Sequence, residues 1–197
     1  MFTKINPCFM KKNIVLVLLL FMAGTVSLNA QITLYKGIKS GWYESGLKEF
    51  LNSSPDFTSE NYNNEFDYYT TTINGKLYIF RPGYNKYSEL YVIDFVSDST
   101  YTSLYDENLR SNVREFYYML QERYGDPVYD KWSEVTYMEN SSQRLIYIFG
   151  SEPDMGGIKI ERGYDGSYSV ILSFEDMSKE LLDDDTSDGG DDSDDLY

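Results

Sequence analysis

The sequence of 197 residues contains no histidine and a single cysteine, Cys8. Without histidine, the chain lacks the base of Ser-His and Cys-His nucleophile pairs and the most frequent metal ligand of proteins. It also lacks a Gly-x-Ser-x-Gly elbow and a phosphate-binding Gly-Lys-Ser/Thr loop. These absences exclude much nucleophilic, metal-dependent and nucleotide-dependent chemistry, and we expect no cofactor.

No apolar run reaches the about 20 residues that a membrane-spanning helix needs. The run from Ile14 to Val26 follows Lys11-Lys12 and precedes small and polar residues that end at Ala30. This order is typical of a secretory signal peptide over residues 1–30, and the alternative is an uncleaved anchor. Cys8 precedes the apolar run and is therefore misplaced for a lipoprotein. We expect a secreted or periplasmic protein that is not integral to a membrane after cleavage.

Basic residues are scarce: 17 Lys and Arg stand against 32 Asp and Glu, for a net charge of −15. Such a surface repels phosphate backbones, so we expect no nucleic-acid partner. Eight of the acids are aspartates in residues 183–197, which predicts a disordered acidic tail. Within the tail, Asp184, Asp188 and Asp195 weakly imitate a calcium loop, without its usual bidentate glutamate.

Tyrosine, by contrast, is abundant, with 20 residues in a chain that is 17% aromatic. Aromatic side chains suit half-buried sheet surfaces, where the ring packs and the phenol reaches water. The alternative is a binding face for a carbohydrate or protein partner that is built on aromatic platforms.

Two segments have the pattern of an amphipathic helix. In residues 107–124, Leu109, Val113, Phe116 and Leu120 recur at spacings of four, three and four. Asp106 is placed to cap this helix, and Gly125 with Pro127 is a strong stop signal. A weaker helix is predicted over residues 42–51.

The remaining segments predict antiparallel strands. Asn74-Gly75 is typical of a type I′ hairpin, here between strands 66–73 and 76–80. A loop over residues 81–88 leads into a strand over 89–96. The second half repeats this order, with strands 132–138 and 143–149, a loop over 151–157, and strands 158–163 and 167–174 around a second I′ signal at Asp165-Gly166.

The order of elements is a helix and three strands, then a helix and four strands. It predicts an α+β fold in one domain over residues 31–182, with tandem helix-plus-sheet repeats over 40–97 and 106–175. The competing architecture is a single curved antiparallel sheet wrapped on one main helix.

The junction Tyr124-Gly125-Asp126-Pro127 at the end of the long helix, followed by Trp132, resembles that of small exported bacterial proteins, many without an assigned function. The tandem layout is similar to the β-lactamase-inhibitor-protein-like fold, which includes inhibitors and outer-membrane assembly lipoproteins. The resemblance implies interaction rather than catalysis, and no functional residue transfers with it.

We therefore expect a non-enzymatic exported protein that binds a protein or carbohydrate partner. The alternative is a glycoside hydrolase that uses two carboxylates, which needs no histidine. Its acids would come from the folded body, and Glu134, Glu139, Asp154 and Glu161 are candidates, although no spacing singles out a pair.

The predicted partner site lies on the two equivalent loops, since tyrosine and arginine are enriched in binding hot spots and loops carry many binding residues. The first loop contributes cationic and aromatic side chains, and the second an acid and a flexible methionine. The candidate residues are Arg81, Tyr84, Lys86, Tyr87, Asp154 and Met155.

Overall fold

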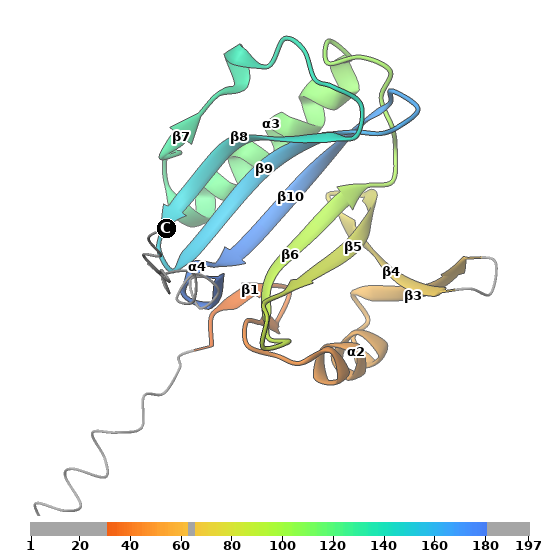
Figure 1. The fold of residues 1–197 in the computed structure, drawn as a ribbon, viewed down its shortest axis with the longest axis vertical. Helices are drawn as coiled ribbons and strands as arrows, with labels where there is room; N and C mark the ends of the chain where they lie inside the picture. The colour runs from red at the N-terminus through yellow and green to blue at the C-terminus, as the bar shows by residue number, and fades with distance from the viewer. Residues whose placement is uncertain (1–30, 63–65, 181–197) are drawn as a thin grey trace, which may run out of the picture. The chain divides into compact units, whose positions relative to one another are not determined.

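The computed structural model describes residues 31–62 and 66–180 (Figure 1). The predicted signal peptide and the predicted acidic tail with its calcium-like aspartates lie outside these residues. The helices and strands in chain order are β1 (Thr33–Tyr35), β2 (Ile38–Lys39), α2 (Glu44–Ser53), β3 (Phe57–Tyr62), β4 (Phe66–Ile73), β5 (Lys76–Tyr84), β6 (Leu90–Ser97), α3 (Glu107–Tyr124), β7 (Tyr129–Asp130), the 3₁₀ helix η1 (Trp132–Glu134), β8 (Ser142–Ser151), β9 (Asp154–Arg162), β10 (Tyr168–Asp176) and α4 (Met177–Glu180).

Eight strands form one antiparallel sheet in the order β3-β4-β5-β6-β10-β9-β8-β7, and β1 and β2 form a separate pair. Strands β3 to β6 are neighbours in chain order, as are β7 to β10. The two groups meet where β6 pairs with β10, with Phe95 opposite Leu172. The α+β class predicted from the sequence is therefore confirmed.

The main helix, α3, has the predicted bounds. Asp106 caps its start, because its Oδ1 accepts a hydrogen bond of 2.8 Å from the backbone N–H of Asn108. Gly125 follows its end with a φ of 85°, a conformation that favours glycine. The predicted apolar stripe is buried in full, with Leu109, Val113, Phe116 and Leu120 at most 4% exposed.

One predicted hairpin turn is confirmed and the other is wrong. Asn74 and Gly75 join β4 to β5 with φ values of 51° and 78°, both positive as a type I′ turn requires. Between β9 and β10, Gly166 has a positive φ but Asp165 does not. Strand β9 ends at Arg162 and β10 begins at Tyr168, so the connection is longer than a two-residue turn. It therefore needs one residue with positive φ instead of two.

Strands extend into both predicted loops, over residues 81–84 of the first and over all but residues 152–153 of the second. Strand β5 continues through Arg81, Pro82 and Gly83 to Tyr84, and its pairing with β4 ends at Phe80. Since Pro82 lies beyond that pairing, its missing N–H costs no ladder hydrogen bond on that side. Strands β8 and β9 likewise leave only residues 152–153 as a turn.

The predicted strand over residues 132–138 is also wrong. The short helix η1 begins this segment, and Tyr129–Asp130 pairs with β8 as β7 instead. Strand β3 was not predicted, because its sequence Phe-Thr-Ser-Glu-Asn-Tyr lacks the apolar alternation that marks a half-buried strand.

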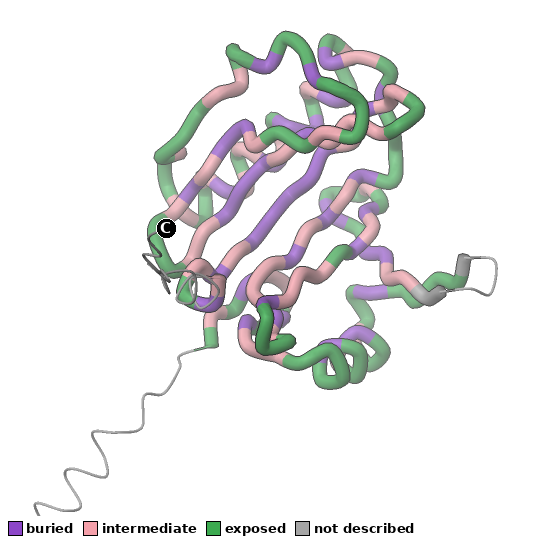
Figure 2. Tube along the Cα trace, in the orientation of Figure 1, coloured by how far each residue is buried: buried purple, intermediate pink, exposed green. Residues whose placement is uncertain are grey.

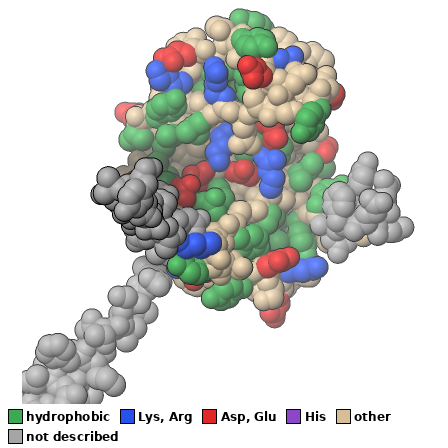
Figure 3. Space-filling view, viewed as in Figure 1, with side chains coloured by type: hydrophobic (Ala, Val, Ile, Leu, Met, Phe, Trp, Pro, Cys, Tyr) green, Lys and Arg blue, Asp and Glu red, His purple; other side chains and the backbone are tan. Residues whose placement is uncertain are grey.

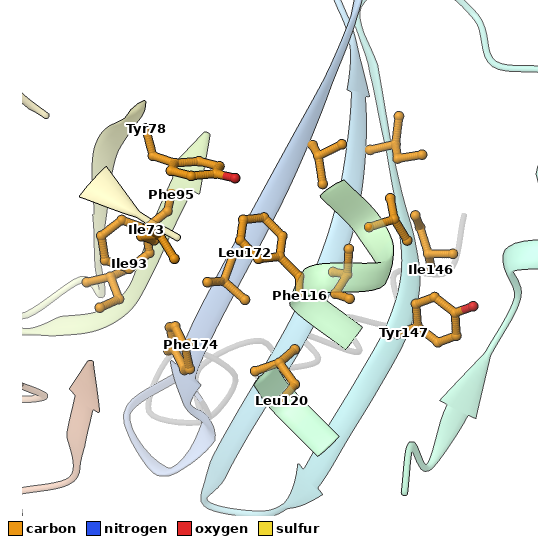
Figure 4. Close-up of a cluster of buried hydrophobic side chains, with 14 of the residues drawn as sticks. Ile73, Tyr78, Ile93, Phe95, Phe116, Leu120, Ile146, Tyr147, Leu172 and Phe174 are labelled. Atoms are coloured by element: carbon orange, nitrogen blue, oxygen red, sulfur yellow. The ribbon is translucent and has the colours of Figure 1, made fainter. Parts of the chain in front are cut away.

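Helix α3 packs on β8, β9 and β10 and covers one face of that part of the sheet (Figure 1). Figure 4 shows Phe116 and Leu120 of α3 beside Leu172 and Phe174 of β10, and Figure 2 shows continuous burial along β10. The core is rich in aromatic rings, and the centroids of Tyr78 and Phe116 lie 5.2 Å apart. Tyr78, Tyr147 and Tyr168 of the sheet are buried in this core, so core packing explains part of the tyrosine content.

Two buried tyrosines keep a partner for their hydroxyl groups. Tyr78 Oη donates to Asn112 Oδ1 at 2.7 Å, and Asn112 Nδ2 donates to Tyr101 Oη at 3.1 Å. Asn112 on α3 is therefore buried at little cost, since its polar atoms are satisfied.

Candidate functional site

The opposite face of the sheet, which α3 does not cover, contains a hollow with a volume of about 510 Å³. Helix α4 borders one end of it, and we call it the sheet hollow. Its lining residues come from β6, β8, β9, β10 and α4: Tyr91, Val92, Asp94, Leu145, Ile148, Met155, Gly156, Gly157, Lys159, Glu175, Met177 and Glu180.

Strand alternation assigns side chains to this face. In β6, Ile93 and Phe95 belong to the buried core, and Asp94 between them points to the opposite face. The same alternation places Lys159 between the core residues Ile158 and Ile160. These two strands each place a charged residue on this face, and Figure 3 shows acidic and basic side chains gathered near its middle.

Small residues deepen the hollow. Asp94 of β6 lies opposite Ser173 of β10, which in turn lies opposite Gly157 of β9. A Cβ atom on Gly157 would lie in van der Waals contact with Leu145 Cδ1 at 3.4 Å, so a side chain larger than alanine would extend into the hollow. A row with large side chains at Ser173 and Gly157 would fill the space.

Five charged residues form a continuous network across four strands, which we call the charge ladder: Arg81, Asp94, Lys159, Glu161 and Glu175. Arg81 Nη2 lies 3.1 Å from Glu161 Oε2 and 3.7 Å from Asp94 Oδ2. Lys159 Nζ lies 3.6 Å from Asp94 Oδ1 and 2.8 Å from Glu175 Oε1. Ser173 Oγ donates to the same Glu175 oxygen at 2.8 Å.

Lys159 is held as a cation by its neighbours. Burial lowers the pKa of Lys159, but Coulombic attraction to Asp94 and Glu175, with the hydrogen bond to Glu175, raises it by more. The net pKa lies above the ordinary value of 10.5. The ammonium group therefore stays charged at neutral pH and fixes both carboxylates in place.

Replacing Lys159 with methionine is expected to lower the free energy of unfolding by about 3 kcal/mol, because Glu175 loses its cation and Asp94 keeps only Arg81, at 3.7 Å. Urea unfolding measures the loss. Adding Asp94→Asn and Glu175→Gln to the same variant should restore most of it, since no uncompensated charge then remains. Lys48→Met on the exposed side of α2 is the control and should cost under about 0.5 kcal/mol. A loss that the added substitutions do not relieve would contradict the charge argument.

The predicted site residues are divided among several places. Met155 lines the sheet hollow, and Arg81 belongs to the charge ladder beside it. Tyr84 lines a different hollow, between α2 and β5, together with Glu44 and Leu47. The structure therefore brings Arg81 and Met155 to one face and leaves Tyr84 elsewhere.

The other three predicted residues have local roles. Lys86 Nζ lies 5.3 Å from the centroid of the exposed Tyr87 ring, in the turn between β5 and β6. Asp154 accepts a hydrogen bond of 2.7 Å from Tyr124 Oη and pairs with Arg123 at 3.3 Å. Since Arg123 also donates to the carbonyl of Thr33 at 2.9 Å, Asp154 helps to tie β1 to α3 and β9.

The sequence analysis missed Asp94, Lys159 and Glu175, although a signal was present for the first two. Asp94 and Lys159 are each flanked on both sides by apolar residues, as in Ile158-Lys159-Ile160, whereas Glu175 is followed by Asp176 and carries no such signal. The prediction that the chain has no Ser-x-x-Lys motif is wrong, since Ser45 and Lys48 have that spacing. Both side chains are exposed on α2, and no hydrogen bond or ion pair joins them in the described structure.

Within residues 31–62 and 66–180, no cluster of three or more acidic side chains is arranged to hold a metal ion. Over the same residues, no helix combines the length and apolar character needed to cross a membrane. Comparisons with protein-family models, curated proteins and solved structures give no match to this chain.

Proposed function

We propose that the protein is an exported, non-enzymatic binding protein whose sheet hollow receives a basic and partly apolar surface of a protein partner. The observation that carries this proposal is Asp94 Oδ1. This carboxylate oxygen is buried and has no hydrogen-bond partner among the described residues. Its neighbour Lys159 Nζ is 3.6 Å away, beyond hydrogen-bond range. An unsatisfied buried acceptor is costly, and a positive charge that a partner brings to the hollow would offset part of that cost through Coulombic attraction.

The charge of the site supports a basic partner. The charge ladder holds three acids and two cations, and Glu180 adds another acid at the border of the hollow. The whole chain carries a net charge of −15, which accelerates encounter with a positively charged partner at low ionic strength.

The apolar rim of the sheet hollow favours a protein partner over a small polar solute as its ligand. Aliphatic and methionine side chains surround the charges, namely Val92, Leu145, Ile148, Met155 and Met177. Methionine is flexible and polarisable, so it adapts to irregular apolar surfaces of a partner. An apolar rim around a few fixed polar groups is suited to a lysine or arginine side chain, whose stem is apolar and whose end is a donor.

The alternative, a carboxylate-based glycoside hydrolase, finds less support in this site. Such enzymes need two carboxyl groups with open space between them for the glycosidic bond. Between Asp94 and Glu175 stands the ammonium group of Lys159. Among the candidate acids named from the sequence, Glu134 pairs with Lys131, Asp154 with Arg123 and Glu161 with Arg81.

We also infer that the two halves are tandem repeats, over residues 40–97 and 106–175, as in the β-lactamase-inhibitor-protein-like layout. Each half runs as a helix followed by four strands, and the fourth strands β6 and β10 pair with one another. Export through a signal peptide over residues 1–30 belongs to the same proposal and would deliver the binding face outside the cytoplasm.

The test uses a photo-reactive benzoylphenylalanine at Met155, on the rim, and at Val128, which is 68% exposed and outside the hollow. Each protein is irradiated with the extracellular fraction of its source. We expect a discrete cross-linked product from position 155, absent from position 128, and weakened by raised salt. Equal cross-linking from both positions, or none from position 155, would contradict the proposal.

A charge-reversal experiment controls for non-specific capture. For this experiment the photo-reactive residue is placed at Met177. The substitution Met155→Lys then adds repulsion toward a basic partner and should reduce the recovery of the cross-linked product at least tenfold. Val128→Lys adds the same charge elsewhere and should leave recovery unchanged. Both variants must melt within a few degrees of the parent, which shows that the fold is intact.

A further inference from the structure

Another hollow lies on the α3 side of the molecule, and its charged lining residues are both basic, unlike those of the sheet hollow. Its volume is about 280 Å³, near the lower end of the range for small-ligand sites. Its lining combines two arginines with four aromatic side chains and one valine: Arg110, Val113, Arg114, Tyr117, Tyr118, Trp132 and Tyr147. We call it the arginine hollow.

Neither arginine is neutralised within the part of the chain that the structure describes, where Arg110 and Arg114 take part in no ion pair. The Nε–H of Arg110 is moreover buried without an acceptor. The two residues are four apart on α3, so their guanidinium groups lie on one face and repel one another. An acidic protein that leaves two adjacent cations unpaired at a hollow presents a local site for an anion.

The aromatic walls are held rigidly. The Tyr117 ring packs edge-on against Tyr147 and Phe149, with centroid distances of 5.1 and 5.3 Å. On the other side, the Trp132 side chain is partly buried and packs against the hydrophobic core. The Tyr118 ring is 61% exposed at the edge of the hollow. Rings already fixed in place lose little entropy when a ligand packs against them.

Tyr147 contributes a neutral hydroxyl. Burial raises the pKa of Tyr147 to about 12, with smaller contributions from Asp130 and Tyr117. The phenol therefore keeps its proton at neutral pH and adds no negative charge to the hollow.

We propose that the arginine hollow binds a sugar that bears a carboxylate, such as a uronic acid residue. A guanidinium group recognises a carboxylate through two parallel N–H donors, and Arg110 and Arg114 both line the hollow. The ring of the sugar presents polarised C–H groups, which pack on the electron-rich faces of Trp132 and Tyr118. This site lies on the other side of the sheet from the sheet hollow, so it does not depend on the partner proposed above.

The experiment titrates the intact protein with D-glucuronate and follows binding by calorimetry and by the amide resonances of α3. D-Glucose tests the ring without the charge, and acetate tests the charge without the ring. We expect saturable binding of glucuronate that weakens as salt increases, and at least tenfold weaker binding of glucose and of acetate. Acetate binding as tight as glucuronate binding would overturn the sugar assignment, and the absence of saturable glucuronate binding would overturn the site.

Variants locate the site. Arg110→Gln and Arg114→Gln should each weaken glucuronate binding at least tenfold, and Trp132→Leu should weaken glucuronate binding while leaving acetate unchanged. Arg144→Gln removes the same charge from an exposed position on β8, outside the hollow, and should leave binding unaltered. If Arg144→Gln weakens binding as much as Arg110→Gln, only net charge is involved and the proposal is wrong.

Discussion

Replacing Phe116 by alanine is expected to lower the free energy of unfolding by about 3–5 kcal/mol, as large truncations of buried aromatic residues do. Phe116 is 1% exposed, and its ring lies 5.2 Å from that of Tyr78. It joins α3 to the sheet near the Tyr78–Asn112 hydrogen bond, so the space it leaves is bounded by a strand and a helix that cannot collapse freely. Equilibrium unfolding in urea measures the loss.

The matched control is Tyr118→Ala, two residues further along the same helix. Tyr118 is 61% exposed and contacts Tyr117 edge-on at 5.7 Å, so its removal should cost at most about 1 kcal/mol. Both substitutions remove an aromatic ring from the same helix, and they differ in burial. Similar losses from the two variants would show that the orientation of α3 is wrong.

Stability is expected to fall steeply above pH 10, because several tyrosines are protonated more firmly in the folded protein than in the unfolded chain. Burial raises the pKa of Tyr147 and, with Glu44, that of Tyr84 from 10.0 to about 12. Burial also raises the pKa values of Tyr35, Tyr78 and Tyr124. A group with a raised pKa stabilises the fold fully below its unfolded pKa and loses that contribution as pH rises through its folded pKa. Each such group can contribute at most about 1.4 kcal/mol per pH unit over its window.

Urea unfolding at a series of pH values measures this slope, which should be small between about pH 7 and 9. Tyr147→Phe removes one titrating group from a site that is 8% exposed, so the decline between pH 10 and 12 should become shallower by about 1 kcal/mol per pH unit. Tyr164→Phe is the control, since that side chain is 90% exposed and should leave the slope unchanged. A stability that stays constant up to pH 12 would contradict the burial of these phenols.

Local signals predicted the local structure well. The stripe of Leu109, Val113, Phe116 and Leu120, the cap at Asp106 and the stop at Gly125 define α3 without reference to any other element. Asn74-Gly75 likewise determines its own turn, because the positive φ values it needs belong to those two residues.

The predictions failed where neighbouring strands decide the outcome. Pro82 and Gly83 have the composition of a loop, but β6 pairs with them and extends β5. The segment over residues 132–138 contains strand-forming residues but does not pair with β8. Tyr129–Asp130 pairs with β8 instead, and Trp132 begins a 3₁₀ helix. In each case, a partner distant in sequence outweighs the local preference.

The sequence by itself determined the α+β class, the main helix with its buried face and the scarcity of catalytic side chains. Tertiary structure alone decided the candidate sites. Asp94, Lys159 and Glu175 become neighbours because β6 pairs with β10 and β10 with β9, and no local pattern encodes that order of strands. Helical and turn signals depend on residues a few positions apart, whereas a binding site depends on the register between strands that are distant in the chain.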